Sequence, residues 1–195
     1  MPRLISSATL SAAALVTAVV SAAVANPAHA IGFTDSYAPE NFILENVDTD
    51  GSFDLSDIPN SLVIIGGNNG TGVSGSTRYL TTAVASGLVS FDWLYKTTDP
   101  SATYDPFGYW LNNAFTQLTN NSLSTQDGNA VFSVQVGDRF GFGINTQDNL
   151  PASASVTISN FIAPETTPAA VPTPALGFGL VGMGIAALRQ RLAQD

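Results

Sequence analysis

Cysteine is absent from this chain of 195 residues, and histidine and lysine occur once each, as His29 and Lys96. Without cysteine the chain can form neither disulfides nor a thiolate nucleophile. His29 lies in a segment that we expect to be removed. The mature chain would then lack a Cys/His zinc site and a histidine to activate a serine nucleophile. These absences predict that the protein is not an enzyme.

Positive charge is also scarce. Residues 31–165 contain three basic residues and fourteen Asp and Glu residues, a net charge of −11. Nucleic acid and anionic membrane surfaces would repel such a domain. The acidic side chains either bind calcium or keep an exported protein soluble.

The first 30 residues have the features of a secretory signal peptide. Arg3 precedes an apolar, alanine-rich run that ends near Ala25, and the small residues Ala28 and Ala30 flank His29. A small-x-small triplet after an apolar run is typical of a signal-peptidase site, so we expect a signal helix in residues 1–30 and cleavage after Ala30. An N-terminal membrane anchor that stays attached is the alternative.

Residues 31–163 have the pattern of an all-β ectodomain. Short segments alternate apolar and polar residues, and turn sequences rich in Gly, Asn and Asp separate them at intervals of about ten residues. This spacing predicts an antiparallel β-sandwich, jelly-roll-like or immunoglobulin-like. We expect strands at 61–66, 78–84, 87–96, 108–113, 114–118, 129–136, 139–145 and 153–163.

One of the expected turns carries a hairpin signature. Gly137 and Asp138 separate two alternating segments over residues 134–142, which predicts a hairpin with these two residues at its tip. The alternation also predicts that Phe132, Val134 and Val136 face inward.

The first acidic loop is a candidate calcium site. Asp48, Asp50 and Asp54 lie around Gly51, as in loops that surround a hard cation with oxygen atoms. The spacing departs from the EF-hand pattern, which has Glu at its twelfth position where this chain has Pro59. A solvated acidic turn is the alternative.

The second acidic loop lies between Asp99 and Asp105. Each precedes a proline, which is a common way to begin a turn. Calcium could bridge this loop with help from Asp92 or Asp148. Calcium is therefore the one cofactor that the sequence suggests, and no metal site is firmly assigned.

Aromatic residues concentrate between positions 91 and 110. Trp93 shares one face of its expected strand with Val89 and Phe91, which favours the core. Tyr109 and Trp110 point in opposite directions if both belong to one strand. One of them is therefore a candidate for stacking on a sugar ring at the surface.

The C-terminal part has a different composition. Residues 164–174 contain four prolines and predict an extended spacer. Residues 175–188 are uncharged and predict a short transmembrane helix, roughly 21 Å long against a hydrocarbon thickness of about 30 Å. Arg189 and Arg191 lie in the basic end, 189–195, as expected for a cytoplasmic flank.

This order of segments resembles a PEP-CTERM sorting signal, in the PTPA variant of cyanobacteria. The motif falls on Pro172, Thr173, Pro174 and Ala175, ahead of the apolar run and the arginines. The resemblance implies an exosortase-like membrane protease as partner and a cell-surface or extracellular-matrix location, often beside exopolysaccharide production. It also implies a β-sandwich ectodomain in front of the tail.

Two functions are consistent with these features. The first is a non-enzymatic structural or adhesive role for an exported surface protein. The alternative is a carbohydrate-binding module, with or without a requirement for calcium, that has extracellular polysaccharide as its partner.

Overall fold

The computed structural model describes residues 28–166. Eleven strands and two short 3₁₀ turns make up this part of the chain. They are β1 (Ala28–Ile31), η1 (Asp35–Tyr37), η2 (Pro39–Asn41), β2 (Ile43–Val47), β3 (Ser52–Asp54), β4 (Ser61–Ile65), β5 (Gly75–Thr82), β6 (Gly87–Lys96), β7 (Phe107–Leu111), β8 (Ala114–Gln117), β9 (Thr125–Val134), β10 (Arg139–Thr146) and β11 (Ser155–Glu165).

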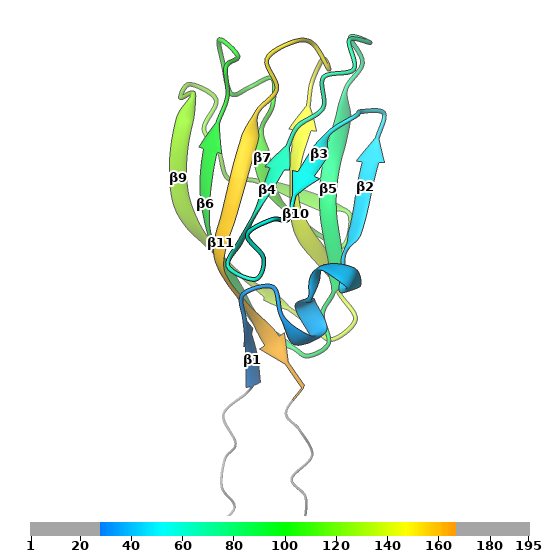
Figure 1. Cartoon of the computed structure of the whole chain (residues 1–195), viewed down its shortest axis with the longest axis vertical. Coiled ribbons are helices and arrows are strands. Elements are labelled where there is room, and N and C mark those ends of the chain that lie inside the picture. Colours follow the sequence, from blue (N-terminus) through cyan, green and yellow to red (C-terminus); the bar gives the residue numbers. More distant parts are fainter. Residues whose placement is uncertain (1–27, 167–195) are drawn as a thin grey trace, which may run out of the picture.

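The strands form two antiparallel sheets packed face to face (Figure 1). Sheet A has the order β3-β4-β11-β6-β9, and β1 pairs with β11 beside this path. Sheet B has the order β2-β5-β10-β7-β8. The predicted all-β antiparallel sandwich is confirmed, and the finer jelly-roll description stays a prediction.

Several predicted segments lie outside the described residues. These are most of the signal peptide, the sorting motif at 172–175, the transmembrane segment 175–188 and the basic end with Arg189 and Arg191. Among residues 28–166 no helix is long and apolar enough to cross a membrane.

All eight predicted strands are present, with ends shifted by a few residues. The sequence did not indicate β1, β2 and β3. Four of the five residues of β2 are exposed, so it lacks the apolar–polar alternation that identified the other strands. β3 has only three residues, too few to show a period.

The predicted hairpin at Gly137 and Asp138 is wrong. The turn exists, with Gly137 at a φ of 89°, but β9 pairs with β6 in sheet A while β10 pairs with β5 and β7 in sheet B. The turn therefore carries the chain from one sheet to the other. Val136 lies in this crossing and is 67% exposed, so its predicted inward position is also wrong. Alternation reports which face of a strand is buried and does not report which strand pairs with it.

The core lies between the sheets and is rich in aromatic rings. Phe161 of β11 stacks on Phe33 at a centroid distance of 4.9 Å and meets Phe142 of β10 edge to face at 5.7 Å. A register shift in the pairing of β11 with β6 separates Ser159 from Ile162, and Asn160 has a φ of 50°. This bulge turns Phe161 inward, which explains why alternation fails near the end of β11.

The described chain begins and ends at the same end of the sandwich (Figure 1). Ala30 of β1 lies opposite Ala163 of β11. Next to this pair, the Glu165 carboxylate accepts hydrogen bonds from the Ser36 backbone N–H (3.1 Å) and hydroxyl (2.8 Å). The predicted cleavage site, with Ala28 and Ala30, therefore lies within β1.

Candidate functional site

The outer face of sheet B carries two rows of residues that cross its strands. Tyr79 and Phe142 are fully buried, so their neighbours along β5 and β10 point away from the core. Pairing places Ile43, Leu80, Gly141, Trp110 and Phe115 in one row, and Glu45, Arg78, Gly143, Gly108 and Gln117 in the next. An apolar row thus runs beside a polar one on the same surface.

Trp110 lies over a strand that has glycine where a side chain would collide with the indole. A Cβ atom at Gly143 would lie 2.9 Å from the Trp110 Nε1 and 2.8 Å from a backbone carbonyl oxygen. On the sheet surface, the Arg78 Cζ lies 3.8 Å from the centroid of the Trp110 ring, and the Phe115 ring packs at 5.2 Å. This cation–π contact and the glycine beneath it hold the indole in one place.

The other predicted stacking residue, Tyr109, points the opposite way. Its ring stacks on Phe132 of β9 at 4.2 Å with an interplanar angle of 2°. Trp93 is in the core as predicted, with an exposed fraction of 8%. Of the two candidates, Trp110 is therefore the one on an outer face.

Two of the three basic residues of the body, Arg78 and Arg139, lie on this face around Glu45. The Glu45 Oε2 lies 3.7 Å from the Arg78 Nη1, and Oε1 lies 3.7 Å from the Arg139 Nη2. Both distances exceed those of hydrogen bonds. Within residues 28–166 the buried Oε2 has no hydrogen-bond partner. Burial lowers the pKa of Arg78, and the Glu45 carboxylate opposes this change while the Arg139 charge adds to it.

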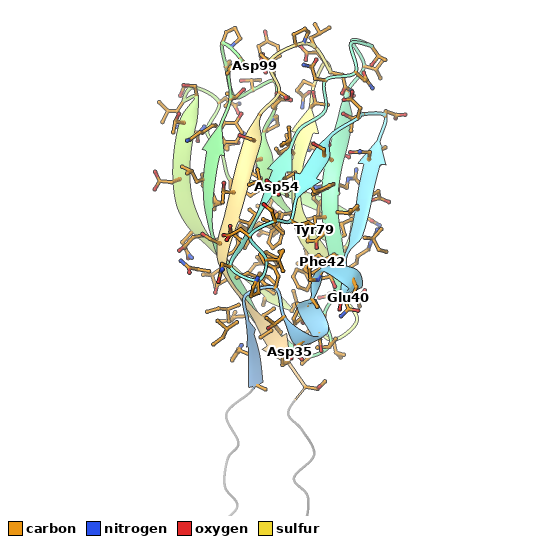
Figure 2. All side chains as sticks on the ribbon, in the orientation of Figure 1. Asp35, Glu40, Phe42, Asp54, Tyr79 and Asp99 are labelled. Carbon is orange, nitrogen blue, oxygen red and sulfur yellow. The ribbon has the colours of Figure 1, made fainter. Side chains whose placement is uncertain are left out.

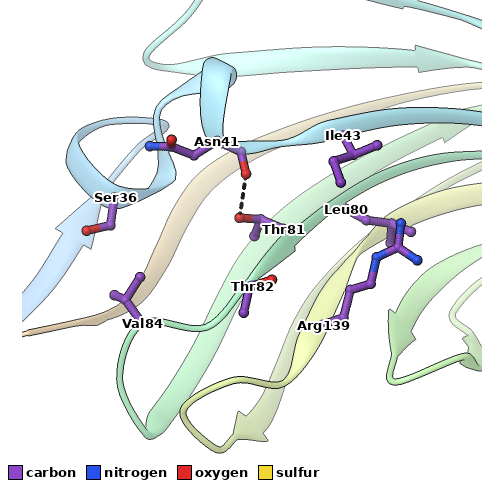
Figure 3. A pocket seen from close by; sticks show the side chains of 8 residues that line it. All are labelled: Ser36, Asn41, Ile43, Leu80, Thr81, Thr82, Val84 and Arg139. Atoms are coloured by element: carbon purple, nitrogen blue, oxygen red, sulfur yellow. Dashed lines mark hydrogen bonds between the residues drawn. The ribbon is translucent and has the colours of Figure 1, made fainter.

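A pocket of about 390 Å³ opens beside Arg139, where the end of β5 and the start of β10 meet η1, η2 and the start of β2 (Figure 3). Its lining combines apolar, hydroxyl and amide groups with one guanidinium: Ile43, Leu80, Val84, Ser36, Thr81, Thr82, Asn41 and Arg139. The Thr81 hydroxyl donates to the Asn41 carbonyl at 2.9 Å. Concave surfaces that join apolar groups with a few polar groups are typical of ligand sites.

Asp99 and Asp105, predicted to flank a calcium loop, do come together. Asp105 is only 2% exposed, and its Oδ2 accepts a hydrogen bond from the Ala154 N–H at 3.1 Å. Burial, reinforced by a hydrogen bond with Asp99, raises the pKa of Asp105 to about 7. Burial also raises the pKa of Asp99, and the nearby charge of Asp148 contributes. The pair shares a proton more readily than two solvated carboxylates would.

The remaining calcium candidates lie apart from this pair. Figure 2 shows Asp99 at one end of the sandwich and Asp54 well away from it. Carboxylate oxygens of Asp50 and Asp54 accept hydrogen bonds from backbone N–H groups, and Asp48 is exposed. Asp92 is held by two asparagine side chains. Among residues 28–166 no three acidic side chains gather as a metal site, so calcium stays a prediction.

The sequence did not identify Glu45, Arg78 and Arg139 as parts of a site. One signal was available: only three basic residues occur in the body, and two of them begin predicted strands, 78–84 and 139–145. The sequence did not show that β5 and β10 are neighbours, because 60 residues lie between Arg78 and Arg139. Glu45 lies in β2, a strand that shows no alternation.

No protein-family model matches the chain, and no curated protein matches it. Solved structures of similar shape include carbohydrate-binding modules. A family 35 module from Clostridium thermocellum has 13% identity and a TM-score of 0.36 over 67% of this chain and 97% of its own. A CBM35 domain from Cellvibrio japonicus has 10% identity and a TM-score of 0.37 over 72% and 100%. The N-terminal cellulose-binding domain of a Cellulomonas fimi β-1,4-glucanase has 12% identity and a TM-score of 0.36 over 67% and 93%.

These three likenesses are to carbohydrate-binding modules or domains. At such identities and TM-scores they carry no argument about ligand or site.

Proposed function

We propose that the chain is an exported, non-catalytic glycan-binding domain whose binding surface is the outer face of sheet B. The observation that carries the proposal is Trp110, half-buried on that face over Gly143 and stacked against Arg78. An indole held in one place binds a sugar ring with little loss of conformational entropy. The pocket at the other end of the same row adds hydrogen-bonding and apolar groups.

The rows of this face suit a chain of sugars better than a single sugar. Leu80, which lines the pocket, and Trp110 belong to one row and lie two strands apart. Neighbouring strands are about 4.8 Å apart, so the two side chains start about 10 Å from each other. A ligand that contacts both has to be an oligosaccharide or polysaccharide.

Export and delivery to the cell surface belong to the same proposal. They are supported by the signal-peptide pattern of residues 1–30 and by the resemblance of residues 172–191 to a PEP-CTERM sorting signal. The exosortase-like protease would act on the tail, and the sandwich would remain as the functional part at the surface or in the polysaccharide matrix.

Retention of the purified domain on immobilised polysaccharides tests the proposal. Trp110→Ala removes the indole from this face and is expected to weaken binding about tenfold, which corresponds to about 1.4 kcal/mol. Leu94→Ala is the matched control, because Leu94 is exposed on the outer face of sheet A. It should leave binding unchanged.

Two results would contradict the proposal. Binding that survives Trp110→Ala would place the site elsewhere on the domain. Absence of saturable binding to any neutral or acidic polysaccharide would favour the structural or adhesive role instead.

A further inference from the structure

The charges on the outer face of sheet B do not balance. Arg78 and Arg139 carry two positive charges, and the single carboxylate between them is Glu45. One positive charge is therefore left over, in a body whose net charge is −11. The third basic residue, Lys96, is exposed on β6 in the other sheet. The face that holds Trp110 is thus a locally cationic spot with one excess positive charge, and the Glu165 carboxylate bound to Ser36 of the pocket lining partly opposes it.

Of the two guanidinium groups, that of Arg139 has more donors to offer. The Arg78 Nε donates to the Ser76 hydroxyl at 2.7 Å, and its guanidinium stacks on Trp110. The side chain of Arg139 is 39% exposed and lines the pocket, and its ion pair with Glu45 is longer than a hydrogen bond (Figure 3). The five N–H groups of a guanidinium normally find hydrogen-bond acceptors. The Arg139 side chain borders the pocket, where a ligand could supply such acceptors.

We infer that the pocket receives an anionic group of a polysaccharide, either the carboxylate of an acidic sugar or a sulfate ester, which Arg139 binds. This inference rests on the proposed function, because it identifies the ligand class of that same face. A guanidinium binds carboxylate and sulfate-like groups through two parallel N–H donors. The Thr82 hydroxyl and the apolar side chains of Ile43 and Leu80 then face the rest of the sugar.

Glu45 acts as the internal competitor of the ligand. Its carboxylate neutralises part of the charge of both arginines but forms no hydrogen bond with either guanidinium. An incoming anion would replace the Glu45 carboxylate, which lies 3.7 Å from each guanidinium, as the negative partner of Arg139. Neutralising Glu45 should therefore strengthen binding of an acidic ligand, which is the opposite of what loss of a structural ion pair would do.

The acidity of the whole domain opposes this binding only at long range. Charges separated by more than about 8 Å are largely screened at physiological ionic strength, whereas a direct contact between Arg139 and an anion is screened less. Binding of the acidic ligand should consequently be favoured by moderate salt over very low salt.

Titration calorimetry in EDTA with matched acidic and neutral ligands tests the inference. The first pair is oligogalacturonate and its fully methyl-esterified form, and the second is dextran sulfate and dextran. We expect at least one acidic member to bind at least tenfold tighter than its neutral partner. A preference for the acidic member of the first pair indicates a carboxylate ligand, and a preference within the second pair indicates a sulfate ester.

Variants assign this preference to the pocket. Arg139→Gln should abolish the preference for the acidic ligand, and Glu45→Gln should increase it at least threefold. Lys96→Gln removes the same charge from the other sheet and should change nothing. Arg139→Lys keeps the charge without the two-donor geometry and should retain only part of the preference, and thermal melts of all variants report folding.

The outcomes separate the two proposals. Equal binding of acidic and neutral members, lost in Trp110→Ala, would overturn the anion subsite and leave glycan binding intact. A preference that persists in Arg139→Gln would also overturn the subsite. Equally tight, Arg139-dependent binding of poly-L-glutamate would overturn polysaccharide as the ligand class. Absence of binding to all four glycans and to the polysaccharide panel would overturn the proposed function itself.

Discussion

Asp105 links the protonation of one side chain to the stability of the fold. Its pKa is raised from 3.8 to about 7, mainly by burial, so the folded protein holds this proton more tightly than the unfolded chain does. The resulting stabilisation is fully present below pH 3.8 and is lost as the pH rises through 7. Asp54, Asp92 and Asp138 have lowered pKa values and titrate below this window.

We therefore expect the free energy of unfolding to decrease from pH 5 to pH 8, by on the order of 2–3 kcal/mol. Asp105→Asn should remove most of this decrease, because an amide can accept the hydrogen bond from Ala154 N–H and donate to Asp99 without a proton to lose. Urea denaturation at both pH values measures the effect. Asp127→Asn, at an exposed position, is the control, and a wild-type pH dependence in Asp105→Asn would contradict the assignment.

The same variant tests the predicted calcium site. Calcium bound between Asp99 and Asp105 would replace their shared proton. Millimolar calcium should then raise the melting temperature of the wild type modestly at pH 8 and have no effect on Asp105→Asn. Identical melts of the wild type in calcium and in EDTA would eliminate the site.

At the scale of loops and strands, the Asn149 side chain joins three of the loops that link the strands. Its side chain is fully buried. Oδ1 accepts a hydrogen bond from the Thr49 hydroxyl (2.6 Å), and Nδ2 donates to the carbonyl oxygens of Asp48 (2.8 Å) and Val73 (2.6 Å). An amide thus organises the loop that the sequence suggested for calcium. Its φ of 51° is a conformation that asparagine tolerates.

Asn149→Asp should destabilise the fold by roughly 3 kcal/mol at neutral pH. The substitution keeps the shape and the backbone conformation but removes both N–H donors and places a carboxylate against two carbonyl oxygens. Chemical denaturation measures the loss, and part of it should be recovered at low pH when the new carboxyl is protonated. Asn113→Asp is the matched control, because Asn113 also has a positive φ, 71°, but is exposed. Equal stability of the two variants would contradict the role of Asn149.

At the scale of the whole molecule, both ends of the described chain leave from one end of the sandwich. The predicted cleavage after Ala30 would remove three of the four residues of β1 and leave Ile31 as the first residue. The aromatic core does not depend on these three residues, since Ala30 is the one among them that is buried. Processing is therefore compatible with the fold.

Mass spectrometry of the protein isolated from its native surface tests this processing. We expect an N-terminus at Ile31 and loss of the residues beyond the motif Pro172–Thr173–Pro174. An intact Asp195 on the mature surface protein would contradict the sorting hypothesis. Retention of Met1 would contradict the signal peptide.

Several properties follow from the sequence by itself, because they depend on local pattern and composition. Alternation places Val89, Phe91 and Trp93 inward and sends Tyr109 and Trp110 to opposite faces, since successive side chains of a strand point in opposite directions. Turn residues mark where each of the eight predicted strands ends. These rules predict the sandwich and make one of Tyr109 and Trp110 a surface candidate before any strand is paired.

The partners of those strands were decided by the tertiary structure. Gly137 and Asp138 form the same kind of local turn whether the next strand pairs in the same sheet or crosses to the other, and burial of both apolar faces in one core favours the crossing. The cationic spot has the same origin. Arg78 and Arg139 meet around Glu45 only because β2, β5 and β10 are neighbours in sheet B, and such long-range pairing depends on the packing of the whole core.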